Sequence, residues 1–209
     1  MNGVHGGVSM VGKVEERRKD LRDRLIWIAE RHIEEEGLSA VKARALATEA
    51  DCSVGAIYNV FDDLQDIMIA VNGRTFQSLG AHVAKALDGK TNLPPTDRLI
   101  VMSHAYMDYA ALHPNLWRAL FGLRMSTDMQ VPQWYLDELA RLFGYISGPV
   151  SECFPDFDAE EVDLMTRTLF SSVHGIVLLG LENRISAVPE AQLEYMIALL
   201  LRSATQKKI

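Results

Sequence analysis

Residues 43–62 read ARALATEADCSVGAIYNVFD, and this stretch decides the fold. Its apolar residues have the spacing of a miniature core between two short helices that cross at a fixed angle. Ala47 supplies the small residue needed where the second helix crosses the first closely. Ser53 can cap the second helix, because its hydroxyl can accept a hydrogen bond from a free backbone N–H. The stretch therefore predicts a helix-turn-helix whose core residues are Leu46, Ala50, Cys52, Ile57 and Val60. The alternative for this pattern taken alone is a simple pair of short core helices.

The tight turn of this unit is predicted at Asp51. Glycine is commoner in such a turn, because it reaches the left-handed backbone region without steric cost. Aspartate tolerates that region better than most residues, at some cost in free energy. We therefore expect a turn that is formed but strained.

Hydrophobic periodicity in the rest of the chain predicts an all-α protein of about nine helices. They are expected at residues 16–36, 42–50, 54–60, 64–87, 96–112, 114–124, 133–152, 159–184 and 189–205. The helix at 96–112 is apolar on nearly all sides and should be central in its domain. We expect a disordered tail at 1–15, a helix-turn-helix domain at 16–62 and a second domain at 63–209.

The charge balance is acidic, with a formal net charge of −7, which argues mildly against nucleic-acid binding. A basic run nevertheless precedes the helix-turn-helix, within reach of a phosphate backbone, and comprises Arg17, Arg18, Lys19, Arg22 and Arg24. The alternative is a solvated helix face with local ion pairs, because acidic residues are interspersed in the run.

Other classes of protein are disfavoured by what the sequence lacks. Neither a Glu-x-x-His pattern nor HExxH, GxSxG or a Gly-rich phosphate loop occurs, so we expect no enzyme, no cofactor and no metal site. The two cysteines, Cys52 and Cys153, are expected to be reduced thiols. The apolar stretch 169–181 is too short and too polar to span a bilayer. We therefore expect a soluble, cytoplasmic protein that does not contact a membrane.

Residues 17–71 resemble the TetR/AcrR family of transcriptional regulators. LIWIAERHIEEEG at 25–37 is similar to the first-helix pattern of that family, and LATEADCSVGAIYNVF at 46–61 is similar to its helix-turn-helix signature. HPNLWRALF at 113–121 and VHGI at 173–176 look like a subgroup with a Trp-His-Gly signature in its C-terminal domain. Departures occur at Asp51, Val60 and Leu64, where the family commonly has Gly, His or Tyr, and a phosphate-binding Lys, respectively.

The resemblance implies a repressor that binds an inverted-repeat operator in double-stranded DNA as a homodimer. Carried over by position, Val54, Gly55, Ala56 and Asn59 would face the major groove. With the basic residues and the flanking side chains, the candidate DNA-binding residues are Arg17, Arg18, Lys42, Arg44, Ser53, Val54, Gly55, Ala56, Tyr58 and Asn59. Among these residues Asn59 can pair with adenine, and Val54 or Ala56 can contact a thymine methyl. Asn59 fits equally well as an ordinary exposed polar residue.

The same resemblance implies a small apolar or amphipathic effector that binds in the second domain, and dimerisation through the last two long helices. The candidate effector residues are Met102, Tyr106, Tyr109, Trp117, Phe121, Met125, Trp134 and His174. The alternative for each residue is an ordinary place in the core, and the helix faces can also pack within one monomer. The alternative function is an all-α small-molecule-binding or adaptor protein that does not bind DNA.

Overall fold

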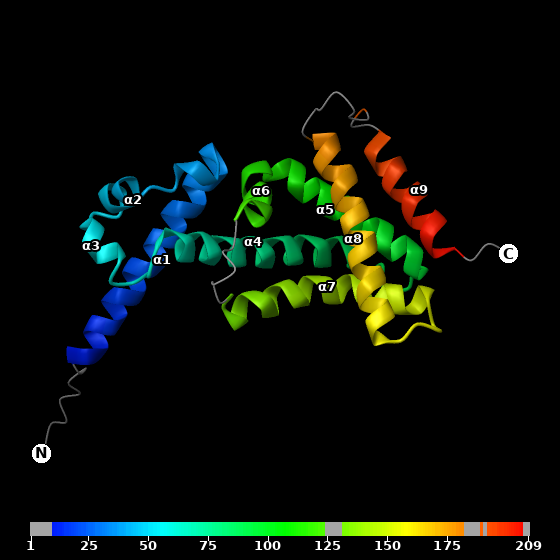
Figure 1. Ribbon diagram of the computed structural model, residues 1–209, viewed down its shortest axis with the longest axis horizontal. Coiled ribbons are helices and arrows are strands. Elements are labelled where there is room, and N and C mark those ends of the chain that lie inside the picture. Colours follow the sequence, from blue (N-terminus) through cyan, green and yellow to red (C-terminus); the bar gives the residue numbers. More distant parts are fainter. Residues whose placement is uncertain (1–9, 124–130, 182–188, 190–191, 207–209) are drawn as a thin grey trace, which may run out of the picture. The chain divides into compact units, whose positions relative to one another are not determined.

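The computed structural model describes residues 10–123, 131–181, 189 and 192–206, and all regular structure in these ranges is helical (Figure 1). This confirms the predicted all-α class. The helices are α1 (Met10–Glu36), the short 3-10 helix η1 (Leu38–Ala40), α2 (Ala43–Glu49), α3 (Val54–Ile57), α4 (Leu64–Leu87), α5 (Pro95–Leu112), α6 (Pro114–Gly122), α7 (Gln133–Cys153), α8 (Ala159–Leu181) and α9 (Leu193–Thr205).

Within the described residues, three helix ends differ from the prediction by three residues or more, and one of them is the start of α9, at Leu193 instead of residue 189. Helix α1 begins at Met10, so the expected tail at 1–15 is wrong for residues 10–15, and residues 1–9 lie outside the described part of the chain. Lys13 and Glu15 are good helix formers and no proline interrupts this segment, so the helix extends. Helix α3 ends at Ile57 rather than residue 60, because the amides of Val60 and Phe61 both donate to the Ile57 carbonyl, which tightens the last turn.

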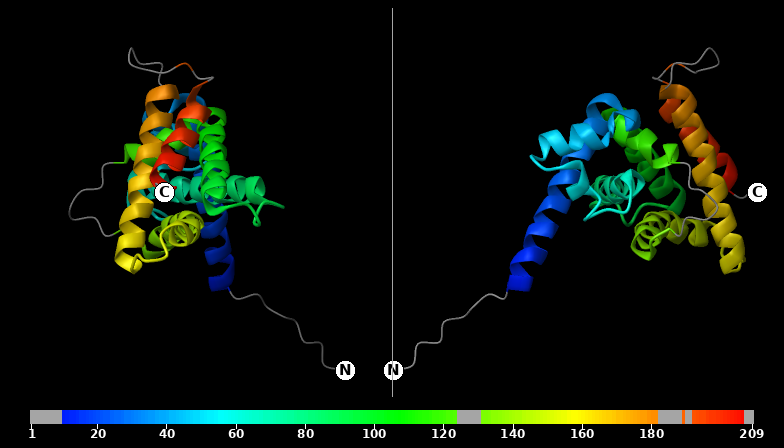
Figure 2. Two further views of the ribbon diagram at one scale, coloured as in Figure 1. Left: turned by 90° about the vertical axis from the view of Figure 1, so that its right-hand side faces the viewer. Right: turned by 60° about the vertical axis from the view of Figure 1, so that its left-hand side comes forward.

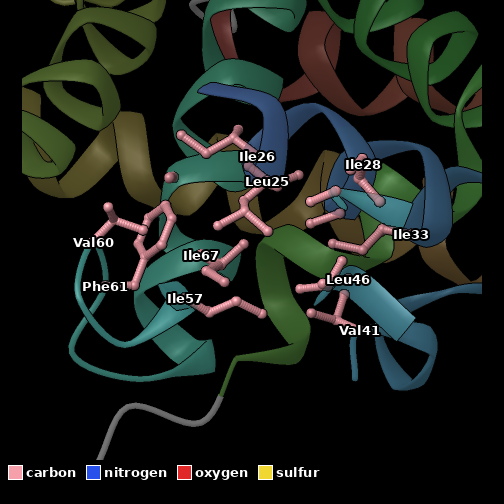
Figure 3. Packing of buried hydrophobic residues seen from close by; sticks show 14 of the residues in the cluster. Leu25, Ile26, Ile28, Ile33, Val41, Leu46, Ile57, Val60, Phe61 and Ile67 are labelled. Carbon is pink, nitrogen blue, oxygen red and sulfur yellow. The ribbon is translucent and has the colours of Figure 1, made fainter. Parts of the chain in front are cut away.

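The chain forms two compact units, and the first combines residues 1–74 with 115–127. Its core joins α1, α2, α3 and α4, and Figure 3 shows Leu25, Ile57 and Ile67 pointing toward one another. Leu116 and Ala119 of α6 are buried in the same cluster. The division expected at residue 62 therefore falls inside this unit, because the first part of α4 and most of α6 supply apolar residues to its core.

The second unit contains residues 75–114 and 128–209. Helix α5 contacts α7, α8 and α9, which confirms its predicted central place. Figure 2 shows α8 and α9 side by side, and these helices also contact each other. The buried residues of α5 are Leu99, Ile100, Met102, Ala105, Tyr106, Met107, Tyr109 and Ala110.

Helix α4 starts at a side-chain cap and runs through both units. The Asp66 amide donates to Oδ1 of Asp63 at 2.9 Å, and the Asp62 amide donates to Oδ2 of Asp66 at 3.1 Å. These carboxylates satisfy amides that have no partner within the helix and oppose the positive end of its dipole. The acidic residues around position 63 therefore begin the helix.

Helix α8 is the one helix of the described ranges that is long and apolar enough, by length and composition, to cross a membrane. The expectation that it is too short considered residues 169–181 alone, whereas the helix has 23 residues. Length and composition do not separate a spanning helix from a core helix of a soluble protein. Leu169, Val173 and Val177 are buried, and 28% of the apolar window of this helix is buried within the described chain.

Candidate nucleic-acid interface and effector site

The turn between α2 and α3 is held by two backbone hydrogen bonds. The Cys52 amide donates to the Ala47 carbonyl at 3.0 Å, and the Asp51 amide donates to the Thr48 carbonyl at 3.3 Å. This pair of bonds is a Schellman motif, which requires a left-handed residue between the last helical turn and the next segment. Asp51 is that residue, with φ 51°, and it is the one non-glycine residue with positive φ in the described ranges. The predicted turn at Asp51 is confirmed.

Helix α3 begins at a capped serine. Oγ of Ser53 accepts a hydrogen bond from the Ala56 amide at 3.1 Å, as the sequence predicted. The cap satisfies one of the amides that a helix N-terminus leaves without a partner. It also fixes the backbone direction at which the chain enters α3.

The two sides of the α3 segment differ in exposure. Ile57 is fully buried in the core of the first unit. On the other side, Val54 is 37% exposed and Tyr58 is 48% exposed. Gly55 and Asn59 are also exposed, and Ala56 is half-buried. The structure therefore groups the predicted groove-facing residues on the solvent side of one short segment.

The four basic residues predicted to bind phosphate, Arg17, Arg18, Lys42 and Arg44, are all exposed. The first two lie near the start of α1 and the other two at the start of α2. Two further arginines of the predicted basic run are used within the protein. Arg22 donates to the Val60 carbonyl at 3.1 Å, and Arg24 donates to the Ala50 carbonyl at 3.1 Å.

Several acidic side chains of the first unit have partners of their own. Glu49 bonds to Nε2 of His32 at 2.9 Å and to Arg31, which also bonds to Glu35 at 3.0 Å. The His32 hydrogen bond, aided by Arg31, lowers the pKa of Glu49. These pairs use Arg31 as well as the two carboxylates, so they hold the acidic side chains in place and leave the net charge of the unit unchanged.

The eight predicted effector residues do not form one group. Trp117 is buried and Phe121 is half-exposed, and both belong to the first unit with α6. Met125 lies outside the described residues. Trp134 is largely exposed at the start of α7. The remaining four lie in the second unit, where Met102, Tyr106 and Tyr109 are buried and His174 is half-buried.

Within that second unit, Tyr106 and His174 form a polar pair. Oη of Tyr106 and Nδ1 of His174 lie 2.7 Å apart, at hydrogen-bonding distance. Burial lowers the pKa of His174 from its ordinary value, so the ring is neutral at neutral pH. The pair therefore provides a neutral donor and acceptor among apolar side chains.

Two phenylalanines that sequence reasoning missed complete this cluster. Phe170 stacks on His174 with ring centroids 5.8 Å apart, and its edge meets Tyr106 at the same centroid distance. Phe143 of α7 packs on Phe170 at 5.2 Å. The spacing of Phe170 four residues before His174 on one helix was the available signal, because such residues share a face.

The fold and the exposed α3 segment are those of an all-helical regulator with a helix-turn-helix. A family model described as the tetracyclin repressor-like C-terminal domain matches residues 99–201, which include both segments with the Trp-His-Gly resemblance. A curated relative, the uncharacterized HTH-type transcriptional regulator Rv0681 of Mycobacterium tuberculosis, is 27% identical over 83% of this chain and 78% of its own length. Both matches support a transcriptional regulator of the TetR family.

Solved structures show the same fold along nearly the whole chain. A protein of unknown function from Rhodococcus sp. RHA1 matches with a TM-score of 0.71 and 21% identity, over 89% of this chain and 96% of that one. RolR in complex with resorcinol matches with a TM-score of 0.67 and 19% identity, over 91% and 90%. FadR from Bacillus subtilis in complex with stearoyl-CoA matches with a TM-score of 0.65 and 18% identity, over 88% and 99%.

Proposed function

We propose that this chain is a cytoplasmic, homodimeric repressor that releases an inverted-repeat operator when a small effector binds its second unit. The observation that carries the proposal is the solvent-facing row Val54, Gly55, Tyr58 and Asn59, next to the capped start of α3. A major groove admits a helix of this kind, and small residues let the backbone approach the base edges. Asn59 would read adenine, and Tyr58 would contact a phosphate.

The backbone contacts are assigned to Arg17, Arg18, Lys42 and Arg44, which the structure leaves exposed. Each phosphate neutralised by such a residue releases counterions and makes binding depend on salt. Four such residues per subunit imply a measurable salt dependence even though the chain is acidic overall.

Dimerisation is assigned to the outer faces of α8 and α9. Large apolar side chains are exposed there, among them Leu179 on α8 and Leu199 on α9. A Cβ built at Gly175 of α8 meets no atom of the described chain within 4 Å, so another helix has room to approach closely. Pairing two such faces about a two-fold axis gives a four-helix bundle, an interface geometry common in homodimers.

The effector is assigned to the cluster around Tyr106 and His174. The neutral pair supplies hydrogen bonds, and Phe143 and Phe170 supply aromatic surface. Resorcinol and stearoyl-CoA are bound by two proteins of similar fold. The rings of this cluster favour a small molecule with an aromatic or apolar body and a hydroxyl or carbonyl group.

Unbiased selection of duplexes from a random pool by the purified protein tests the DNA assignment. We expect an inverted repeat with half-sites about one helical turn apart, roughly 34–36 Å. Asn59→Ala should relax the preference at one base pair of each half-site at a cost of about 1–3 kcal/mol. Asn92→Ala, at an exposed loop position, is the matched control and should leave the selected sequence unchanged.

The alternative without DNA binding predicts a different result. An adaptor or carrier of small molecules would enrich no sequence, and its affinity for random duplexes would not respond to Asn59→Ala. For the effector, a phenol and an acyl-CoA are added separately to the protein–operator complex. A ligand that couples to the operator should weaken binding by about 5–150-fold, or 1–3 kcal/mol.

A further inference from the structure

Two arginines of α1 bind the helix-turn-helix at the points where its chain leaves a helix. Arg24 donates to the carbonyl of Ala50, the C-cap residue of α2. Arg22 donates to the carbonyl of Val60, which follows the last turn of α3. The Ala50 carbonyl is one that a helix C-terminus leaves without a partner in the helix, and the Val60 carbonyl lies in the segment just after α3. Each arginine therefore ties α1 to the chain at or just after a helix end.

Arg22 makes a second contact that Arg24 lacks in the described structure. Its guanidinium carbon lies 4.3 Å from the ring centroid of Phe61, a buried core residue. A planar guanidinium can lie on an aromatic ring and donate sideways to a carbonyl at the same time. A lysine ammonium on its flexible stem does not combine these two contacts in one geometry.

Helix α3 needs such support because it has four residues. A helix this short has almost no stability of its own, so contacts with the rest of the unit set its position. Ser53 fixes its start and Ile57 anchors its buried side. Arg22 and Phe61 are the contacts that fix its far end.

We propose that Arg22 is a positioning residue, which sets the orientation of α3 for base reading and does not contact the DNA backbone. The inference rests on the proposed DNA-binding function and separates Arg22 from Arg17 on the same helix. The side chain of Arg17 is exposed, whereas that of Arg22 is half-buried and directed to Val60 and Phe61. A side chain held in this way is not available to a phosphate.

The first test measures affinity for the selected operator and for an unrelated duplex over a range of salt concentrations. Arg22→Met and Arg22→Lys should both weaken operator binding about tenfold, or 1.4 kcal/mol. Neither should change the affinity for the unrelated duplex or the salt slope. Arg17→Met should reduce the slope by about 0.9, the value for one neutralised phosphate. Recovery of operator binding by Arg22→Lys, or a reduced slope in Arg22→Met, would overturn the proposal.

Loss of folding is distinguished from loss of positioning by comparing the two duplexes. An unfolded fraction lowers the affinity for both duplexes by the same factor, whereas a misplaced α3 lowers operator affinity alone. Phe61→Leu removes the ring beneath Arg22 and should reproduce the effect. Combined with Arg22→Met it should add little, because residues in one contact network are not additive. Full additivity contradicts the proposal.

Amide hydrogen exchange of the protein alone gives a readout that needs no DNA. Arg22→Met should speed exchange at Val60 and Phe61, whose amides donate to Ile57, and leave Cys52 unchanged. Arg24→Met should speed exchange at Cys52 in the α2–α3 turn instead. If Arg22→Met speeds amide exchange equally at all sites, or leaves it unchanged at Val60 and Phe61, Arg22 does not hold the C-terminal end of α3. If no variant binds DNA, the proposed function fails, and the exchange result still decides whether Arg22 fixes α3.

Discussion

Oη of Tyr106 and Nδ1 of His174 lie 2.7 Å apart, and their hydrogen bond joins α5 to α8 inside the second unit. Tyr106 is buried and His174 is half-buried. A polar pair in such a place is stable because each group satisfies the other. Replacing either member leaves a polar group without its partner, and this makes the pair a sensitive probe of the second unit.

The depressed pKa of His174 predicts that the protein loses stability in mild acid. Because burial lowers this pKa, the unfolded chain binds a proton at a pH where the native ring is still neutral. The stabilising contribution is complete above the unfolded value of about 6.5 and is lost as pH falls from there toward the folded value. Urea unfolding at pH 5 to 8 should show this loss in the wild type and a smaller one in His174→Gln.

Tyr106→Phe is the matched control for that experiment. It removes the hydroxyl and keeps His174 surrounded by apolar side chains. The free energy of unfolding should fall by about 1 kcal/mol at every pH, while the dependence on pH stays. If the free energy of unfolding depends on pH in the same way in the wild type and in His174→Gln, the pKa of His174 is the same in the native and unfolded states.

Asp51→Gly should stabilise the protein, because Asp51 occupies the left-handed position of a Schellman motif with φ 51°. Glycine reaches this conformation without strain, which offsets its larger entropy in the unfolded chain. We expect a gain of up to about 1 kcal/mol in the free energy of unfolding. Asp20→Gly on the exposed face of α1 should have the opposite sign, at a cost of about 1 kcal/mol. Denaturant titration of both variants checks the pair.

The helix-turn-helix was predictable from sequence because its determinants are local. The cap at Ser53, the turn at Asp51 and the buried Ile57 follow from residue types within one short stretch, and all three are confirmed. The roles of Arg22 and Arg24 were not predictable in this way. Their carbonyl partners lie 38 and 26 residues away in the chain, and a basic run looks the same whether it binds phosphate or protein.

The effector site was harder to predict for a related reason. Aromatic residues in helices α5 to α8 all resemble core residues, and sequence spacing does not tell which of them meet. Trp117 packs with the first unit, because Leu116 and Ala119 on the same short helix join its core. Tyr106 and His174, 68 positions apart, are brought together by the crossing of two helices.

The proposed dimer face makes a prediction about oligomeric state. Leu199 is 53% exposed on α9, so Leu199→Asp adds no charge to the core of a monomer. In a dimer it would bury a carboxylate against apolar side chains, which costs several kcal/mol. We expect wild-type dimers and mostly monomeric Leu199→Asp in sedimentation equilibrium at micromolar concentration.

Leu112→Asp is the control for the dimer experiment. Leu112 is also largely exposed, at the end of α5, and does not belong to the faces of α8 and α9 assigned to the dimer. The Leu112→Asp variant should remain a dimer. Dissociation of both variants would indicate a general loss of folding. If Leu199→Asp dimerises with the same dissociation constant as the wild type, the interface lies elsewhere.

Two glycines of α8 should respond in opposite ways to substitution by alanine. A Cβ at Gly180 would lie 2.5 Å from Cδ2 and 2.6 Å from Cδ1 of Leu193, a buried residue of α9. Leu193 would have to move within a packed core, so Gly180→Ala should cost about 1–3 kcal/mol.

A Cβ at Gly175 meets nothing within 4 Å in the described chain. Gly175→Ala should therefore stabilise the monomer by up to about 1 kcal/mol through helix propensity alone. Unfolding is measured at several protein concentrations, because the stability of a dimer depends on concentration. If both substitutions cost the same free energy at the lowest concentration, the contact between Gly180 and Leu193 does not control the packing of α8 on α9.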